Sequence, residues 1–410
     1  SEQEGGDCNI WSKVGGHNYC NGGNRYMTNN FFTKWGVANE TCHPYVAKPE
    51  SCLNCPPLKN ANNIRLITGS QGESQISTIK DAILKYGPVQ ANMYAKDPGF
   101  HAYNGGVYEY WGPYPEGEET NHAVQIIGWD DSKVHSHGTG AWLIKNSWGT
   151  AWGTLGPYPG CGWVAYGAAN LGDSTNAIAS YKNPDNVIFY HDECGWFGLG
   201  YGSDQPTGYG AVRFTPSQDL TLTAVDFWAV SSTMNYEIKI FDTLNDLGGG
   251  KYAFSHQLGT TQTGSTEERG YYSIPLNTSV DFKNGNDFIV QVKLTTTGFG
   301  YPVPIDYYDE SWLPSWSSIA TFSGESYYSK EGAQFHKPSL SGVGNVDVGI
   351  RARASAAVTQ PDITVTPPSF NVSRPLNTTW SGTLTIGNVG DTSLSYNITD
   401  RETTGGGSQT

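Results

Sequence analysis

The spacing of apolar residues along this sequence changes at Asn183-Pro184. Before that dipeptide, apolar residues recur at helical spacing over residues 24–35 and 74–86, and later runs such as 123–129 are strand-like. After it, every apolar run is short, and Gly, Asn, Asp and Pro separate the runs. The pattern predicts an α+β unit followed by a region made only of β-strands.

The length of the chain indicates further division. A chain of 410 residues exceeds one typical hydrophobic core, so several domains are expected. We assign residues 1–182 to the first domain, 183–354 to an all-β sandwich, 355–361 to a linker and 362–410 to an incomplete immunoglobulin-like β module. The immunoglobulin-like module is incomplete because glycines from Gly405 onward follow its last strand pattern before a full sandwich is formed.

Charge and hydropathy exclude some partners. The net charge is -14, and no cluster of Lys and Arg offsets it, so the chain is expected to repel nucleic-acid backbones. No run of about 18 apolar residues is present, so no transmembrane segment is expected. The chain begins Ser1-Glu2-Gln3-Glu4 without a signal peptide, and we interpret it as a fragment or a processed form whose targeting signal lies upstream. No motif indicates a cofactor.

The cysteines concentrate near the start of the chain. Five of the seven are Cys8, Cys20, Cys42, Cys52 and Cys55. This clustering predicts disulfides and an extracellular or cell-surface location. Zinc is the alternative, because Cys52-x-x-Cys55 has ligand spacing, but no second pair follows at finger distance and we expect no metal. Cys161 and Cys194 either form a bridge or remain free, and the sequence leaves both alternatives open.

The strongest chemical signal lies in two neighbouring apolar runs. His122 opens the first run, and Asn146-Ser147-Trp148-Gly149 follows the second. If the runs are adjacent strands, the Asn146 amide can fix the orientation and tautomer of the imidazole, so that the other ring nitrogen serves a nucleophile. The large ring of Trp148 would cover this hydrogen bond and exclude water. A lone histidine is more often structural, but the other eight have no comparable setting.

Further motifs follow in the same order as in the papain and cathepsin family. They are Ser1-Glu2-Gln3-Glu4, Asp7-Cys8, Cys20-Asn21-Gly22-Gly23, Pro44-Tyr45, Gly87-Pro88-Val89, Tyr103-Asn104-Gly105-Gly106-Val107-Tyr108, His122-Ala123 and Asn146-Ser147-Trp148-Gly149. Over these residues the chain resembles the cysteine proteases of that family. The resemblance implies a papain-like fold with a helical lobe and a β-barrel lobe.

The family resemblance also implies roles for individual residues. His122 would be the general base and Asn146 the residue that orients it, with Trp148 shielding the pair. Gly22 and Gly23 would offer backbone groups to an extended peptide substrate, although a tight turn alone would also explain them. Asn24, Arg25 and Ala123 resemble the pocket for the second substrate residue on the acyl side of the cleaved bond. Arg25 then favours an acidic or polar side chain in that pocket.

The nucleophile of such a site is expected outside this sequence. In the family it precedes the histidine by about 130 to 150 residues, which places it upstream of Ser1. We therefore expect this chain alone to be inactive. The resemblance also implies that Cys8 pairs with Cys52 or Cys55, and that Cys20 is left unpaired.

Residues 183–354 resemble the lectin-like domain that follows papain-like catalytic domains in some exported archaeal and bacterial proteases. The strand patterns at 208–214, 222–227, 236–240, 286–293 and 301–305 carry this resemblance. Aromatic residues such as Trp196, Trp312 and Trp316 could stack on a glycan or another cell-surface ligand, or they could belong to a core or a domain interface. The expected function is thus a cysteine endopeptidase. The alternative is a surface-binding protein on a protease scaffold that has lost its activity.

Overall fold

The computed structural model describes residues 1–9, 22–67, 73–185, 187–306, 322–356, 363–368, 378–388 and 395. The first region contains the helices α1 (Glu2–Asp7), α3 (Arg25–Lys34), α4 (Glu73–Tyr86) and α5 (Pro98–His101). Its strands are β1 (Asn60–Ile67), β2 (Val89–Met93), β3 (Val107–Tyr108), β4 (His122–His135), β5 (Gly138–Lys145), β6 (Cys161–Ala165) and β7 (Asp173–Lys182), with a short 3₁₀ turn, η2 (Ala168–Asn170).

The following region contains only strands among its described residues. They are β8 (Val187–Phe189), β9 (Gly200–Tyr201), β10 (Thr207–Phe214), β11 (Leu220–Ala229), β12 (Met234–Gly248), β13 (Lys251–Thr266), β14 (Gly270–Phe282), β15 (Phe288–Thr296), β16 (Val303–Asp306), β17 (Ser326–Ser329), β18 (Ser339–Leu340), β19 (Gly344–Asn345), β20 (Asp347–Val348) and β21 (Ile350–Ala356). Two more, β22 (Ile363–Thr366) and β23 (Thr385–Asn388), follow toward the C-terminus.

The helices begin where the sequence supplies caps. The Asn24 side chain accepts hydrogen bonds from the backbone N–H groups of Tyr26 and Met27 and starts α3. Ser1 caps α1 in the same manner through the N–H of Glu4. The reciprocal bond of a capping box is absent, because the Glu4 carboxylate instead accepts from the N–H of Ala38 and ties α1 to the following loop.

One sheet extends through both regions. Its eleven strands follow the order β3-β6-β5-β4-β2-β7-β1-β14-β11-β21-β8. The two regions join where β1 pairs antiparallel with β14, with Ile64 opposite Tyr271 and Arg65 opposite Gly270. Gly270 has a φ of 152°, and a Cβ there would lie 2.1 Å from the Ile64 carbonyl oxygen, so this close pairing requires glycine. The two regions therefore share one continuous β-sheet.

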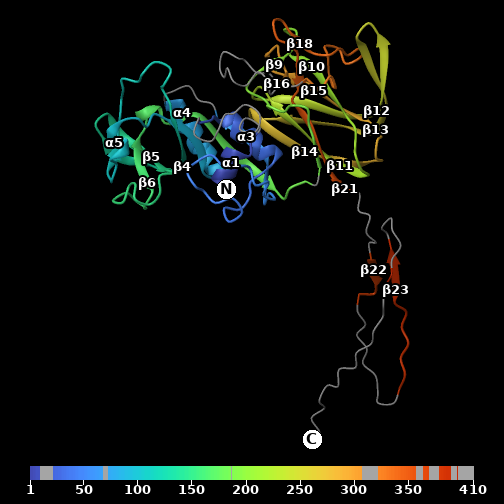
Figure 1. The fold of residues 1–410 in the computed structure, drawn as a ribbon, viewed down its shortest axis with the longest axis horizontal. Coiled ribbons are helices and arrows are strands. Elements are labelled where there is room, and N and C mark those ends of the chain that lie inside the picture. Colours follow the sequence, from blue (N-terminus) through green and yellow to red (C-terminus); the bar gives the residue numbers. More distant parts are fainter. Residues whose placement is uncertain are drawn as a thin grey trace.

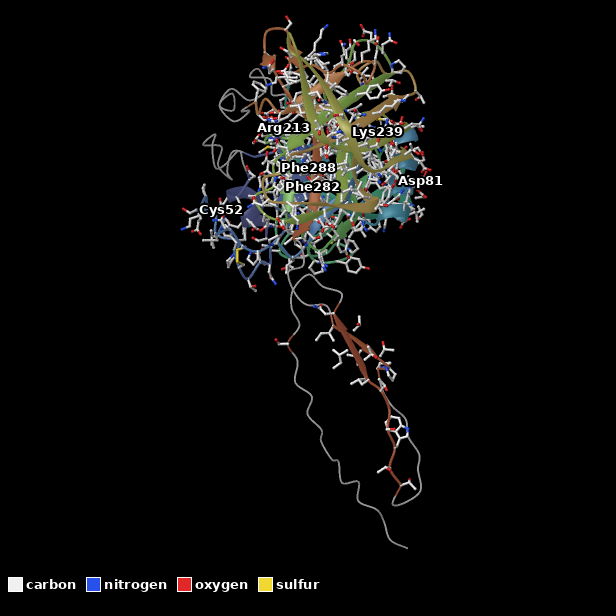
Figure 2. All side chains as sticks on the ribbon, turned by 90° about the vertical axis from the view of Figure 1, so that its right-hand side faces the viewer. Cys52, Asp81, Arg213, Lys239, Phe282 and Phe288 are labelled. Atoms are coloured by element: carbon white, nitrogen blue, oxygen red, sulfur yellow. A yellow bond between two sulfur atoms is a disulfide. The ribbon has the colours of Figure 1, made fainter. Side chains whose placement is uncertain are left out.

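A second sheet of five strands, in the order β13-β12-β15-β10-β17, packs over the β11-β14-β21 part of the first. Apolar side chains from both sheets form a single core, to which Ile64 and Leu66 of β1 also belong. Figure 2 shows Phe282 and Phe288 together in this region, and their rings stack with centroids 4.4 Å apart. A separate core packs α4 against β2, β4 and β5. The β-rich character expected for the second region is confirmed.

Trp196 belongs to this core and is not an exposed aromatic residue. Its side chain is fully buried and packs on Trp228, with ring centroids 5.1 Å apart, and against Tyr26 of α3. The hypothesis that Trp196 stacks on a sugar is therefore wrong. Trp312 and Trp316 lie outside the described residues.

The C-terminal part contributes one described sheet, formed by β22 and β23. Figure 1 shows this pair apart from the other sheets. Two paired strands do not establish the expected immunoglobulin-like module, which is not confirmed. No helix among the described residues is long and apolar enough to cross a membrane.

Candidate active site

Strand pairing brings His122 and Asn146 together. β4 and β5 run antiparallel with Gln125 opposite Lys145, so the start of β4 lies beside the residue that follows β5. The Nε2 atom of His122 lies 2.8 Å from Oδ1 of Asn146. The two residues are 24 positions apart in the chain, and the hairpin that joins them makes the contact local.

The tautomer of His122 follows from the hydrogen bonds of Asn146. The backbone N–H of Ser147 donates to the same Oδ1 atom at 2.8 Å, which identifies that atom as the amide oxygen. Nε2 of a neutral His122 must therefore carry the proton and donate it to Asn146. Nδ1 is left as the acceptor, which is the state that a general base requires.

Aromatic residues enclose one side of the imidazole. The ring centroid of Trp148 lies 5.0 Å from that of His122, and Phe100 lies at 6.1 Å. Trp148 also packs on Phe100 and stacks on His101 at 4.7 Å, while 37% of its surface stays exposed. Burial lowers the pKa of His122, the hydrogen bond that His122 donates to Asn146 opposes this effect, and His101 adds to the lowering. Neutral imidazole is therefore favoured in this chain.

A cavity of about 400 Å³ lies beside His122. It is lined by residues from the start of α3, from β2 and from the start of β4: Gly22, Gly23, Asn24, Arg25, Thr28, Gln90, Asn92, Thr120, Asn121, His122 and Ala123. Five of the six residues predicted to bind substrate are in this group, and the sixth, Trp148, packs on His122 from the side. Gly22 has a φ of 81°, a conformation that favours glycine.

The sequence did not point to the amide and hydroxyl groups of this cavity. Gln90 and Asn92 alternate with buried residues along β2, and the Gln90 amide donates to Oδ1 of Asn92 at 2.8 Å. Thr28 lies one helical turn after Asn24. The signal was present in the period-two pattern of β2, whose polar positions face away from the core.

A second cavity of about 440 Å³ adjoins the first and is lined by residues from six elements and the loops between them, including Glu2, Asn29, Phe32, Lys145 and Asn146. Asn146 therefore has one cavity beside it and His122 another. The two cavities share the lining residues Thr28, Gln90 and Ala123, and we refer to them together as the groove.

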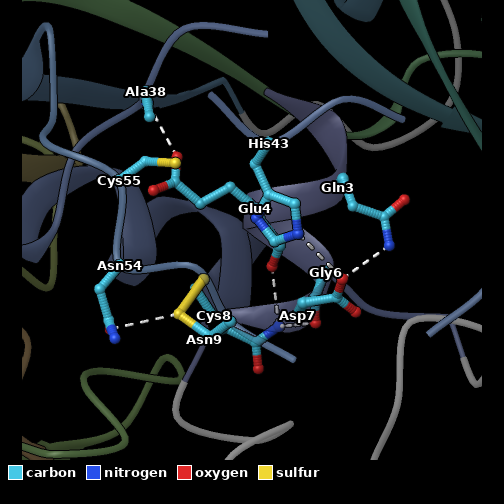
Figure 3. Close-up of a disulfide and its surroundings, with 12 residues drawn as sticks. Gln3, Glu4, Gly6, Asp7, Cys8, Asn9, Ala38, His43, Asn54 and Cys55 are labelled. Carbon is cyan, nitrogen blue, oxygen red and sulfur yellow. Dashed lines mark hydrogen bonds and ion pairs between the residues drawn. A yellow bond between two sulfur atoms is a disulfide. The ribbon is translucent and has the colours of Figure 1, made fainter. Parts of the chain in front are cut away.

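Four cysteines form two disulfides. Cys8 pairs with Cys52, one of the two alternatives expected for it, and Cys42 pairs with Cys55. Figure 3 shows Cys8 beside buried Asp7, which together with Gln3 and His43 anchors α1. Both members of the Cys52-x-x-Cys55 motif are thus used in bridges, and the metal alternative has no support from them.

The remaining described cysteines are not nucleophiles by their setting. Cys161 and Cys194 are buried and free, so the bridge that was left open between them is not formed. Burial raises the pKa of both thiols, which disfavours the reactive thiolate. Cys20 lies outside the described residues.

In this site an asparagine orients an imidazole, and glycines line the groove beside it. This arrangement, on a sheet packed against helices, is that of the thiol proteases. Comparisons with known proteins agree with this class. Residues 1–159 match the model of the papain family cysteine proteases, and residues 188–354 match that of the lectin-like domain. The chain therefore joins a papain-family cysteine protease domain to a lectin-like domain.

Relatives and solved structures support both parts. The chain is 38% identical to cathepsin K of Gallus gallus over 148 residues, which covers 35% of this chain and 41% of that protein. It is 33% identical to a cathepsin L-like peptidase of Aedes aegypti over 157 residues, covering 38% and 43% of the two chains. The chain thus spans less than half the length of these relatives.

The solved structures show a similar fold at low identity. The cysteine protease Cwp84 after propeptide cleavage superposes with a TM-score of 0.63 at 20% identity, covering 82% of this chain and 83% of that one. A structure of the cysteine protease and lectin-like domains of Cwp84, a surface layer associated protein of Clostridium difficile, gives 0.62 at 19% identity and covers 82% and 74%. Both likenesses extend over the protease and lectin-like regions together.

Proposed function

We propose that this chain belongs to a cysteine endopeptidase in which His122 is the general base and Asn146 orients it. The hydrogen bond between His122 Nε2 and Asn146 Oδ1, with Ser147 fixing the amide, is the observation that carries the proposal. It leaves Nδ1 free of that bond and able to take a proton from a thiol. The match of residues 1–159 to the papain family supports the same reaction.

The proposed reaction uses a thiol supplied by a segment N-terminal to Ser1. The thiol gives its proton to Nδ1 of His122, and the thiolate attacks the carbonyl carbon of the peptide bond. The imidazolium then protonates the leaving amine as the C–N bond breaks, which leaves a thioester. A water molecule gives a proton to Nδ1 and attacks the thioester. Release of the acid returns the proton to sulfur.

Substrate binding is assigned to the groove beside His122. The backbone of Gly22 and Gly23 would pair with an extended peptide, because neither glycine carries a side chain that hinders the approach. Asn24, Arg25 and Ala123 would receive the side chain of the second substrate residue on the acyl side. Trp148 would keep water from the His122–Asn146 bond.

The assignment is tested with two forms of the protein. One form starts at Ser1, and the other includes the upstream coding segment. A fluorogenic peptide should be cleaved only by the extended form, and Asn146→Ala should reduce the rate. If the extended form carries no cysteine in the nucleophile position and cleaves no peptide, the protein is a binding protein on an inactive scaffold.

A glycan or cell-surface ligand is proposed for the lectin-like domain. Two aromatic side chains, Phe299 and Tyr301, are 42% and 41% exposed and lie 5.8 Å apart between ring centroids. Exposed rings of this kind stack on sugar faces. The description of Cwp84 as a surface layer associated protein supports an extracellular or cell-surface location for this protein too. Loss of glycan retention in Tyr301→Ala would support the assignment, and no retention by the wild type would contradict it.

A further inference from the structure

Helix α3 lies between the groove and the lectin-like domain, because some of its residues line the cavities and others contact the second region. Its N-cap and first turn, from Asn24 to Thr28, line the cavity beside His122. Asn29 and Phe32 line the adjoining cavity. Figure 1 places α3 near the middle of the molecule, between β4–β6 and the strands of the second region. The groove wall is thus an element that the second region contacts directly.

Arg351 of β21 holds the C-terminal half of α3. Its guanidinium donates to Oγ1 of Thr33 and to Oδ1 of Asn30, both at 2.9 Å, across more than 300 residues of sequence. Asp192 fixes the same guanidinium from the other side through bonds of 2.6–3.0 Å. Arg351 is 1% exposed and Asp192 is fully buried, so water does not compete for these bonds.

Further bonds from the same region reach α3. Arg353, also fully buried, donates to the carbonyl oxygen of Thr33 at 2.7 Å. The Lys34 ammonium donates to the carbonyl oxygen of Glu193 at 2.9 Å and to that of Asp192. These carbonyl and side-chain partners leave the end of α3 little freedom to move along or about its axis.

The start of α3 is also fixed from the second region. The ring of Tyr26 packs edge-on against Trp196 at 6.0 Å and against Phe197 at 5.6 Å. Asn30 donates to the carbonyl oxygen of Trp196 at 3.3 Å. The segment 192–197 therefore follows α3 over more than two helical turns.

We infer that the lectin-like domain is part of the substrate-binding apparatus, with Arg351 and Arg353 acting as positioning residues that hold α3 as the wall of the groove. This inference rests on the proposed protease function. It assigns the domain a role in binding peptide that does not depend on any ligand of its own.

The inference separates binding from chemistry. His122 and Asn146 lie on β4 and after β5, and their hydrogen bonds and the ring contact with Trp148 are with neighbours in the first region. A shift of α3 displaces Asn24, Arg25 and Thr28 but leaves the imidazole and its amide in place. Weakening the bonds from Arg351 and Arg353 to α3 should therefore raise KM and leave kcat unchanged.

Thr33 provides a mild test in the extended, active form. Thr33→Val keeps the shape of this fully buried side chain but removes the oxygen that accepts from Arg351. We expect KM to rise on the order of fivefold at constant kcat, a typical size for coupling between sites. Thr33→Ser retains the hydroxyl and should restore KM. Thr215→Val, which removes an exposed hydroxyl bonded to Asp287, is the matched control and should change neither constant.

Hydrogen–deuterium exchange on the chain starting at Ser1 gives a readout that needs no activity. Arg351→Lys keeps the charge but loses the planar fork, so the amides of residues 26–35 should exchange faster while those of α4 keep their rates. Unchanged exchange in α3 would overturn the inference. An unchanged KM in Thr33→Val, a lowered kcat, or a Thr33→Ser variant as impaired as Thr33→Val would also overturn it. If the extended wild type cleaves no peptide, the proposed function fails, and the exchange measurement alone decides whether the arginines hold α3.

Discussion

Replacing Arg351 with methionine should destabilise the protein severely. The substitution keeps most of the buried volume but removes the guanidinium donors that bond the side chains of Asp192, Thr33 and Asn30. Asp192 is fully buried, and its carboxylate would lose the only guanidinium bonded to it among the described residues. A buried carboxylate that loses the cation bonded to it carries most of the cost of such a change.

The expected loss is large on the scale of folding. Breaking a buried ion pair by removing one partner costs about 3–5 kcal/mol. Typical domains have a free energy of unfolding of about 5–15 kcal/mol, so Arg351→Met should remove a substantial part of it. Arg351→Met combined with Asp192→Leu removes the unpaired charge as well, and we expect it to recover part of the loss.

Urea unfolding followed by tryptophan fluorescence measures these differences, because Trp196 and Trp228 lie in the adjoining core. Arg213→Met is the matched control, since Arg213 pairs with Glu325 at a half-exposed site and should lose only about 1 kcal/mol or less. A loss below about 1 kcal/mol in Arg351→Met would refute the reasoning. A double variant less stable than the single one would refute it too.

Three further predictions concern the site and its surroundings. In an NMR titration of this chain, the pKa of His122 should lie below its usual value of 6.5. Asn146→Ala should lower that pKa further, because the hydrogen bond to Asn146 favours imidazolium. A pKa above 6.5 would contradict the argument that burial lowers it. The extended form should cleave peptides with Glu in the second acyl-side position about tenfold faster than peptides with Gln there. Arg25→Met should abolish that preference. A cleavage profile that does not depend on this charge would exclude a role for Arg25. The Cys42–Cys55 disulfide joins residues 13 positions apart. Its removal should lower the free energy of unfolding by about 3 kcal/mol in the same urea assay. A decrease of less than about 1 kcal/mol would show that other contacts constrain the loop.

Local features of this chain could be predicted from its sequence. The helix over α3 follows from the helical spacing of Met27 and Phe31, and the structure starts it at Arg25. His122 begins β4 and Asn146 directly follows β5, the two strands of one hairpin, so their contact depends on short-range pairing. The family resemblance indicated five further residues of the cavity beside His122, namely Gly22, Gly23, Asn24, Arg25 and Ala123. It did not indicate Thr28, Gln90, Asn92, Thr120 or Asn121.

Long-range contacts could not be predicted. The pairing of β1 with β14 joins residues about 200 positions apart, and no periodicity encodes which strand edge receives which partner. Arg351 and Arg353 occur as alternate residues of a strand, a pattern typical of an exposed face, yet both are buried because Asp192 and Asp226 meet them. For Trp196 the sequence left a core position and sugar stacking open, because an abundance of aromatic residues does not distinguish a core from a surface, and the structure places it in the core.

The proposed ion pair between an upstream thiol and His122 can be measured by the pH dependence of thiol alkylation. In the extended form, iodoacetamide should inactivate the enzyme rapidly well below pH 8.5, because imidazolium at His122 stabilises the thiolate. In His122→Gln the midpoint of the alkylation rate should rise toward about 8.5, the value of an unperturbed cysteine. Equal midpoints in the two proteins would contradict the assignment of His122 as the base of this site.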